Sequence, residues 1–284
     1  MKIVRFRYKG DKVLLGIVDG EYVYEIEDIN KEPKGQSYKL SEIEYEVPIR
    51  PTAIFCTLVN TPRMIGVKSK EEAKELLGSP KFFIKLPYIV TPHRGTVISP
   101  RSGIRPEVEI AVIISKRLRK VSSRHEINDA ILGYSVFNDV TAPREAKGDI
   151  YTAYRRDPAD GKIKKMSIRG AHFRNKNRDT FAPLGPWIVT REEVPDVLSL
   201  RMRSYYDNQI VQDGYSSEFV FDIEEIIMEL SRIVTVPENS IVTTGSIGYL
   251  DSEDPSEYCL EAKDTVMRVE VEKIGILENY VKVE

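Results

Sequence analysis

The sequence has little of what marks several large protein classes. Its 284 residues include two cysteines and three histidines, and no apolar run approaches the roughly 20 residues of a membrane span. Cys56 and Cys259 are too few and too far apart for a disulfide framework, which favours a reducing compartment over secretion. The N-terminal stretch 1–7 mixes apolar with basic residues and lacks the hydrophobic block of a signal peptide. We therefore expect a cytoplasmic protein with no membrane partner.

An excess of one charge sign is also missing. The chain has 42 Lys and Arg against 44 Asp and Glu, a formal net charge of −2. This balance argues against a broad basic surface and predicts no nucleic-acid partner. The chain has no GxGxxG before a helix, no P-loop and no GxSxG. Its histidines (His93, His125 and His172) are isolated and lack zinc-type spacing.

The hydrophobic pattern predicts an α+β fold that is rich in β-structure. Alternating apolar residues and turn signals at Lys9-Gly10-Asp11 and Asp19-Gly20 predict β-hairpins near the N-terminus. Helices are expected at three places where apolar residues recur at helical spacing or capping residues precede them. These are 69–77, 125–132 and 221–233, the last with Asp222 as a possible N-cap. A polar, proline-marked stretch predicts a small N-terminal β unit over 1–50 and a second domain over 51–284.

Glu107 and Glu109 form the sharpest local feature. They stand two apart at the front of the apolar run 108–115, so on a strand their carboxylates would share one face. Adjacent like charges repel, and a cation or a shared proton relieves this. Oxygen ligands of this kind suit Mg²⁺, Mn²⁺ or Ca²⁺. Asp139, which follows the strand-like run 131–137, is a possible third ligand. Two solvated glutamates and a turn-forming Asn-Asp pair are the alternatives.

A second segment, 176–187, begins with basic residues and continues through apolar residues, prolines and a glycine. Lys176 would there bind a carboxylate or stabilise an enolate oxygen, and Thr180 follows as a polar side chain. The alternative is a basic surface loop that leads into a packed strand. Farther along the chain, the stretch 242–248 offers the hydroxyl of Ser246 and a flexible backbone at a strand end, a weak signal for carboxylate binding.

Taken in order, these segments resemble the fumarylacetoacetate hydrolase superfamily over about residues 50–278. The similarity lies in the motifs PEVEIAVII, GYSVFNDVTAP, KNRDTFAPLGPW and TGS, at 106–114, 133–143, 176–187 and 244–246. Each piece is weak alone, but the ordered set is specific. Within the superfamily, the sequences of these motifs are most similar to those of the isomerases and decarboxylases of 4-hydroxyphenylacetate degradation. Those enzymes act on 2-hydroxyhepta-2,4-diene-1,7-dioate and 5-oxopent-3-ene-1,2,5-tricarboxylate.

The resemblance implies a homodimer with a mixed β-sandwich or roll of the family's C-terminal type, together with a small N-terminal β unit. It further implies a divalent metal, Mg²⁺ or else Mn²⁺ or Ca²⁺, together with acidic ligands and substrate contacts from this chain. The implied metal ligands are Glu107, Glu109 and Asp139, Glu107 also having a catalytic role. The implied catalytic and substrate-binding lysine is Lys176, and the further substrate contacts are Lys85, Thr180 and Ser246.

Two departures from the family pattern bear on the reaction. Members that hydrolyse carbon–carbon bonds carry an Asn-Tyr-x-x-His segment, and here Met64 stands in the place of that histidine. The connection 148–171 is also long and basic. It is either a solvated loop or a source of extra cations, among them Arg155, Arg156 and Lys164, for a polyanionic substrate.

The implied function is a metal-dependent isomerase or decarboxylase acting on an unsaturated 2-oxo dicarboxylate or tricarboxylate of aromatic-compound catabolism. Chelation of the 2-oxo acid and stabilisation of an enolate would drive the reaction. The identity of the group that carries the proton stays open, and the candidates are His93, His172 and a metal-bound water. The alternatives are an acylpyruvate or fumarylacetoacetate-type hydrolase, a 2-keto-3-deoxy sugar acid dehydratase, and a binding module without activity.

Overall fold

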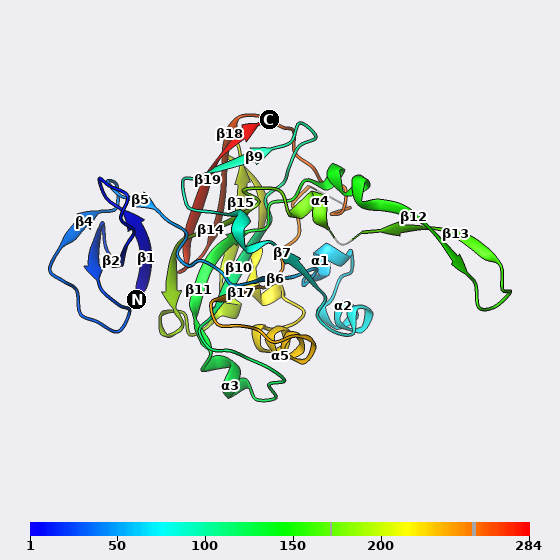
Figure 1. Cartoon of the computed structure of the whole chain (residues 1–284), viewed down its shortest axis with the longest axis horizontal. Helices are drawn as coiled ribbons and strands as arrows, with labels where there is room; N and C mark the ends of the chain where they lie inside the picture. The colour runs from blue at the N-terminus through cyan, green and yellow to red at the C-terminus, as the bar shows by residue number, and fades with distance from the viewer. Residues whose placement is uncertain (171, 252–253) are drawn as a thin grey trace.

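The computed structural model describes residues 1–170, 172–251 and 254–284. Most of the chain forms one body of two packed sheets, with a small sheet unit at one end and a long hairpin at the other (Figure 1). This arrangement confirms the predicted β-rich α+β fold with an N-terminal β unit. No described helix is long and apolar enough to cross a membrane.

The larger sheet has the strand order β4-β3-β2-β1-β14-β11-β10-β17-β6-β7, with β5 beside β1 and β8 beside β14. Most neighbouring strands are antiparallel, whereas β17 and β6, and β14 and β8, run parallel. Its strands are β1 (Lys2–Arg7), β2 (Leu14–Asp19), β3 (Tyr22–Ile26), β4 (Ser37–Lys39), β5 (Glu44–Tyr45), β6 (Ile54–Thr57), β7 (Phe82–Lys85), β8 (Val90–Thr91), β10 (Val108–Ile114), β11 (Ile131–Asn138), β14 (Ala182–Thr190) and β17 (Ser240–Thr243).

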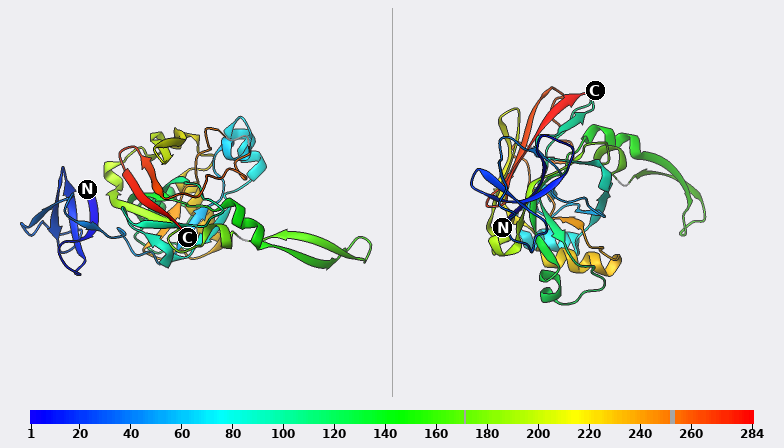
Figure 2. Two further views of the ribbon diagram at one scale, coloured as in Figure 1. Left: turned by 90° about the horizontal axis from the view of Figure 1, so that it is seen from above. Right: turned by 60° about the vertical axis from the view of Figure 1, so that its left-hand side comes forward.

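A second sheet has the order β16-β15-β18-β19-β9, and its apolar side chains share a core with the larger sheet. Its strands are β15 (Arg201–Tyr206), β16 (Gln209–Tyr215), β18 (Thr265–Val271), β19 (Gly275–Val283) and β9 (Thr96–Ser99). The remaining two strands, β12 (Ile150–Arg156) and β13 (Ile163–Arg169), pair only with each other in the described sheets. We call residues 150–169 the arm, and it projects from the body in both views of Figure 2.

The α-helices are short and lie mainly around one end of the sheets. They are α1 (Pro62–Ile65), α2 (Lys70–Leu77), α3 (Arg124–Asn128), α4 (Phe173–Lys176) and α5 (Ile223–Ile233). The predicted caps of α2 and α5 form, because the Ser69 and Asp222 side chains accept hydrogen bonds from the Glu72 and Glu225 amides. For the helix predicted at 125–132, the predicted C-terminal boundary is wrong. The helix stops at Asn128 because residues 131 and 132 belong to β11, where Ile131 pairs with Ile114 of β10.

β10 lies near the middle of the larger sheet and is buried along its whole length. Val108, Ile110, Val112 and Ile114 join the core shared with α5, while Ala111 and Ile113 join the core on the opposite face. This alternation follows the period of two that a strand imposes on its side chains. Glu107 and Glu109 have the parity of Ala111, so the strand directs both carboxylates toward that second face.

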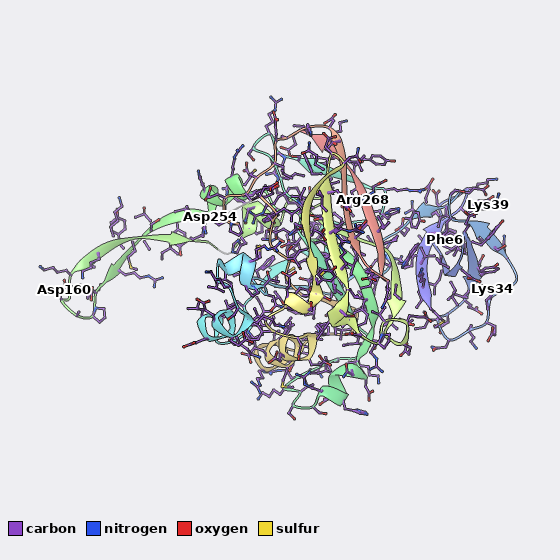
Figure 3. All side chains as sticks on the ribbon, turned by 180° about the vertical axis from the view of Figure 1, so that it is seen from behind. Phe6, Lys34, Lys39, Asp160, Asp254 and Arg268 are labelled. Atoms are coloured by element: carbon purple, nitrogen blue, oxygen red, sulfur yellow. The ribbon has the colours of Figure 1, made fainter. Side chains whose placement is uncertain are left out.

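The N-terminal unit has a small core of its own, formed by Val4, Phe6, Val18, Val23, Tyr38 and Ile43. It is still joined to the larger sheet, because β1 pairs with β14 in the register Lys2 to Val189 and Ile3 to Ile188. Figure 3 shows Phe6 and Lys34 in this unit, at the end of the molecule opposite Asp160 on the arm. The boundary predicted near residue 50 falls between β5 and β6.

Candidate active site

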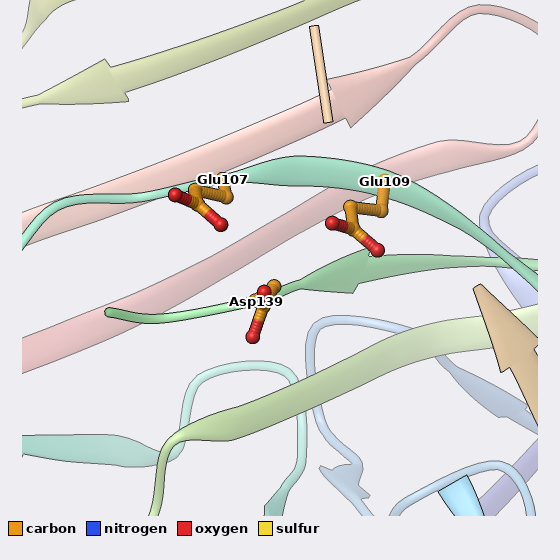
Figure 4. A group of neighbouring side chains, drawn as sticks. All are labelled: Glu107, Glu109 and Asp139. Carbon is orange, nitrogen blue, oxygen red and sulfur yellow. The ribbon is translucent and has the colours of Figure 1, made fainter. Parts of the chain in front are cut away.

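Three buried carboxylates meet where β10 begins and β11 ends. Glu107 directly precedes β10, Glu109 lies within it, and Asp139 directly follows β11. The antiparallel register pairs Val108 with Asn138, and the Asp139 amide donates to the Glu107 carbonyl at 2.9 Å. One carboxylate oxygen from each residue lies within 4.8 Å of the others (Figure 4). The three residues that sequence predicted as metal ligands are thus brought together.

The Lys176 ammonium faces this acidic group. Lys176 ends α4, and its Nζ donates to Glu107 Oε2 at 2.8 Å, to Thr141 Oγ1 at 2.9 Å and to Asp139 Oδ2. Because the side chain is 5% exposed, these bonds lie in a medium where charges interact strongly. The structure therefore places the predicted catalytic lysine directly on two of the three carboxylates.

Two further groups hold Glu107 that the sequence did not assign. Arg105 donates from Nε to Glu107 Oε1 at 2.9 Å, and the Tyr249 hydroxyl donates to the same oxygen at 2.9 Å. The Arg105 guanidinium also donates to the backbone carbonyls of residues 255, 256 and 258. A signal for Arg105 existed, since it stands two residues before Glu107 on an extended chain. No local pattern marks Tyr249.

The surroundings of the carboxylates drive their pKa values apart. Burial favours a higher pKa for Glu107, but the charges of Lys176 and Arg105 outweigh it and hold that pKa well below its usual range. Burial raises the pKa of Glu109 well above its ordinary value, and the charge of Asp139 adds to this. Burial opposes the charge of Lys176, yet Asp139 and Glu107 together raise its pKa. The site therefore has one strongly ionised carboxylate beside one that lacks a compensating charge.

A divalent cation fits the unsatisfied part of this group. Glu109 Oε2 is buried and accepts no hydrogen bond of good geometry in the described chain, although the nearby Thr243 hydroxyl partly offsets the rise in the Glu109 pKa. Asp139 Oδ1 accepts no hydrogen bond of good geometry, although Lys85 Nζ lies 2.8 Å away as an ion pair. Buried carboxylate oxygens without donors are costly unless a charge compensates them, and hard divalent cations prefer such ligands. The donor set of Glu107, Glu109 and Asp139 thus suits Mg²⁺, Mn²⁺ or Ca²⁺.

Lys85 contacts Asp139 and holds the backbone around the carboxylate group in place. Besides its ion pair with Asp139, its Nζ donates to the carbonyls of Val140 at 3.0 Å, Lys176 at 2.8 Å and Phe181 at 2.6 Å. Burial lowers the pKa of Lys85, and the Asp139 charge opposes this. With four partners for its ammonium group, Lys85 fixes the positions of Asp139 and of the Lys176 backbone.

Ser246 and Thr180 are engaged in contacts that hold the fold. The Ser246 hydroxyl accepts from Gln212 Nε2 at 2.9 Å, and Gln212 Oε1 in turn accepts from the Val108 amide between the two glutamates. Gly245 before it has a φ of 78°, and a side chain there would crowd Asn60. The Thr180 hydroxyl accepts from the Ile98 amide at 2.9 Å. Substrate binding by either residue stays a prediction.

A cavity of about 250 Å³ opens onto Glu107 and Lys176. Among the described residues, its lining includes neither Glu109 nor Asp139, and it includes none of Lys85, Thr180 and Ser246. The lining combines apolar residues with charged and polar ones. The lining residues are Leu58, Val59, Met64, Arg105, Glu107, Thr141, Pro143, Ala146, Arg169, His172, Asn175, Lys176, Pro255 and Ser256.

Met64 and His172 both line this cavity, whereas His93 does not. Burial and the Lys176 charge lower the pKa of His172, so its imidazole is neutral near pH 7. His93 packs against Tyr45 and accepts a hydrogen bond from the Glu278 amide at 3.1 Å. Burial, with a contribution from Arg94, lowers the pKa of His93 to about 4. Of the two, only His172 is positioned to exchange a proton with a molecule in the cavity.

A larger hollow of about 680 Å³ lies elsewhere, beside β18 and β19. Both of its arginines are already paired, because Arg201 binds Asp213 and Arg203 binds Glu270. The site chemistry thus belongs to the smaller cavity, where buried carboxylates lie beside the ammonium of Lys176.

Comparison with known families agrees with this site. Residues 53–282 match the model of the fumarylacetoacetate (FAA) hydrolase C-terminal family, and residues 1–45 match an Rv2993c-like N-terminal model. The chain therefore belongs to the fumarylacetoacetate hydrolase superfamily and is an enzyme of that superfamily. The first of these matches covers most of the chain, including every residue of the carboxylate group.

Individual relatives have differing names. An uncharacterized protein of Methanocaldococcus jannaschii, MJ1656, is 30% identical over 271 residues, which are 92% of this chain and 95% of that protein. A 4-hydroxyphenylacetate degradation bifunctional isomerase/decarboxylase of Salmonella dublin is 31% identical over 70% of this chain and 43% of its own length. The mitochondrial oxaloacetate tautomerase FAHD2A of Bos taurus is 28% identical over 85% of this chain and 70% of its own.

Solved structures share the fold along the whole chain. The fumarylacetoacetate hydrolase of Exiguobacterium antarcticum superposes with a TM-score of 0.79 at 22% identity, and the coverage is 100% of both chains. The 2-hydroxyhepta-2,4-diene-1,7-dioate isomerase of Mycobacterium marinum gives 0.76 at 22% identity and covers 100% of this chain and 99% of its own. A maleylpyruvate hydrolase of Sphingobium, solved with manganese(II) and pyruvate, gives 0.72 at 22% identity with the same coverage.

Proposed function

We propose that this enzyme binds a divalent cation through Glu107, Glu109 and Asp139 and isomerises or decarboxylates a 2-oxo dicarboxylic acid. The observation that carries the proposal is the buried Glu109 Oε2, which accepts no hydrogen bond of good geometry in the described chain and lies in one carboxylate group with Glu107, a residue that lines the cavity. A neighbour of the same fold was solved with manganese(II) and pyruvate, a 2-oxo acid, which supports the choice of metal and substrate class.

The cation, when bound, would supply a Lewis acid that polarises the keto group of the substrate. Release of a proton or of CO₂ from a carbon conjugated to that group leaves an electron pair that moves onto the keto oxygen. Lys176 lines the cavity with a fixed positive charge. This charge would stabilise the negative charge that develops on the keto oxygen. Arg105 and Tyr249 keep Glu107 ionised and in place.

His172 is our proposed proton carrier. Its lowered pKa leaves the ring neutral at physiological pH, so one ring nitrogen is free to accept a proton from substrate and return it to another carbon. Asn175 Nδ2 lies 3.4 Å from His172 Nδ1, and because an amide nitrogen only donates, Nδ1 is then the unprotonated nitrogen and would give up this long contact when it accepts a proton. An isomerase moves a proton from one carbon to another, and a decarboxylase delivers a proton to the carbon that has lost CO₂.

Met64 bears on the type of reaction. It lines the cavity as a thioether, which cannot activate water, where hydrolytic members of the superfamily have a histidine. This favours isomerisation and decarboxylation over hydrolysis. The similarity to the oxaloacetate tautomerase supports a second candidate, keto–enol tautomerisation of a small 2-oxo dicarboxylate. That reaction uses the same enolate stabilisation.

Glu109→Gln tests the proposal through metal binding itself. The variant should bind Mn²⁺ at least about 100-fold more weakly in calorimetry and lose turnover of oxaloacetate and of unsaturated 2-oxo diacids. The exposed Glu126→Gln is the matched control and should match the wild type. Because Gln removes a buried carboxylate that has no partner, the metal-free variant should melt no lower than the metal-free wild type.

Retention of Mn²⁺ affinity and activity by Glu109→Gln would show that the acidic group is not the metal site. Hydrolysis of acylpyruvates as the dominant activity would instead overturn the assigned reaction type. We also propose, from the resemblance, that the chain works as a cytoplasmic homodimer, and light scattering of the purified protein measures this directly.

A further inference from the structure

We propose that Arg169, at the base of the arm, determines substrate specificity by binding the second carboxylate of a dicarboxylic 2-oxo acid. This inference rests on the proposed function and assigns one of its specificities to a residue. Arg169 lies in the long basic connection 148–171, whose residue 171 lies outside the described residues.

The backbone holds Arg169 at the mouth of the cavity. Arg169 is the last residue of β13 and pairs with Ile150, the first residue of β12. The next amide, that of Gly170, donates to the Asp149 carbonyl at 3.0 Å and closes the base of the arm. From this fixed position the Arg169 side chain lines the cavity together with His172 and Lys176.

Charge pairing leaves Arg169 free for a ligand. Of the other cationic side chains that line the cavity, Lys176 is bonded to two carboxylates and Arg105 to Glu107. The Arg169 guanidinium forms no hydrogen bond or ion pair with the residues that the structure describes. Asp149, across the base of the arm, is bonded to Arg174 instead. A guanidinium in this state is suited to a carboxylate, which it binds through two parallel hydrogen bonds.

The remaining cations of the arm lie elsewhere. Arg155, Arg156, Lys164 and Lys165 surround a separate hollow together with Asp157, Pro158 and Met166. Figure 3 shows the arm extending away from the body as far as Asp160. The arm thus contributes one cation to the cavity, and its other cations are solvated or paired along its length.

The wall contributed by the segment after Asp139 offers no competing cation. Pro143 and Ala146 line it with apolar atoms, and Arg144 instead donates to the Ser102 carbonyl at 3.1 Å. A substrate whose 2-oxo acid end lies at the carboxylate group and Lys176 would therefore find Arg169 as its remaining positive partner. A second carboxylate supplies the matching charge, whereas an alkyl end does not.

The experiment compares two acids of equal length, 2-oxoglutarate and 2-oxopentanoate, which differ in the terminal carboxylate. Calorimetry is done with the full chain and saturating Mn²⁺. The wild type should bind 2-oxoglutarate about tenfold more tightly, as one charge-assisted contact at a partly solvated site implies. Arg169→Gln should lose this preference and leave the affinity for 2-oxopentanoate unchanged.

Two controls separate specificity from a general loss of charge or structure. Arg155→Gln removes one cation from the outer arm and should keep the preference, while Arg169→Lys should keep part of it because the charge remains. An unchanged preference in Arg169→Gln, or no preference in the wild type, would overturn the assignment of Arg169. Failure of the wild type to bind either acid with Mn²⁺ would overturn the proposed function itself.

Discussion

Two regions of this molecule concentrate charged side chains, which are buried and paired in one region and exposed to solvent in the other. Around the carboxylate group, Glu107 and Asp139 are buried and bonded to Lys176, Arg105 or Lys85. Along the arm, charged side chains lie on exposed strands together with exposed apolar ones such as Tyr154, which is 68% exposed. Water screens the charges of the arm, whereas the buried group is held by fixed partners.

The difference shows why the same residue types have different consequences in the two places. In the interior, removal of one partner strands the other in a medium that solvates it poorly. On the arm, water replaces the lost partner, and an exposed ion pair contributes about 0–1 kcal/mol. We therefore expect substitutions of the buried charged residues to cost more stability than substitutions of the exposed charged residues of the arm.

Lys176→Met should give the largest difference between the regions. It leaves Glu107 and Asp139 without the ammonium that both contact, and we expect a loss of about 3–5 kcal/mol in the free energy of unfolding of the metal-free protein. Urea denaturation measures this. Lys164→Met on the arm breaks an exposed pair with Asp157 and should cost at most about 1 kcal/mol. Equal losses in the two variants would contradict the comparison.

Tyr249→Phe should give an intermediate effect. It removes the hydroxyl that donates to Glu107 Oε1 and leaves the aromatic ring stacked on Tyr258. A hydrogen bond to a buried charged group contributes about 1.5–3 kcal/mol, and thermal or urea denaturation should show a loss in this range. Tyr154→Phe is the matched change on the arm and should lie within about 0.5 kcal/mol of the wild type. A Tyr249→Phe variant as stable as the wild type would mean that Arg105 and Lys176 hold Glu107 without help from the hydroxyl.

The smallest effect is expected when the outer arm is replaced. A short Gly-Ser turn in place of residues 151–168 keeps Ile150 and Arg169 but removes side chains that are mostly exposed. Because an isolated two-stranded sheet buries little apolar surface, the urea midpoint should be almost unchanged. A large drop, or a change in the mass from light scattering, would show that the arm packs against another copy of the chain.

Much of the local structure was predictable because it depends on residues close together in the chain. The period of two predicted that Glu107 and Glu109 share a face, and the buried β10 confirms it. The caps at Ser69 and Asp222 were predictable for the same reason. The end of α3 was not, since pairing of Ile131 with β10 overrides the helical pattern.

Sequence alone determined the strand pattern, the order of the family motifs and the residue types able to bind a divalent cation. Only the tertiary structure decided which cation meets which carboxylate. Tyr249 reaches Glu107 across 142 positions of the chain, and Lys176 reaches it across 69. Lys85 was a predicted substrate contact, and the fold surrounds its ammonium with Asp139 and three carbonyls. Such pairings depend on how strands stack and where the chain turns back, which spacing along the sequence does not encode.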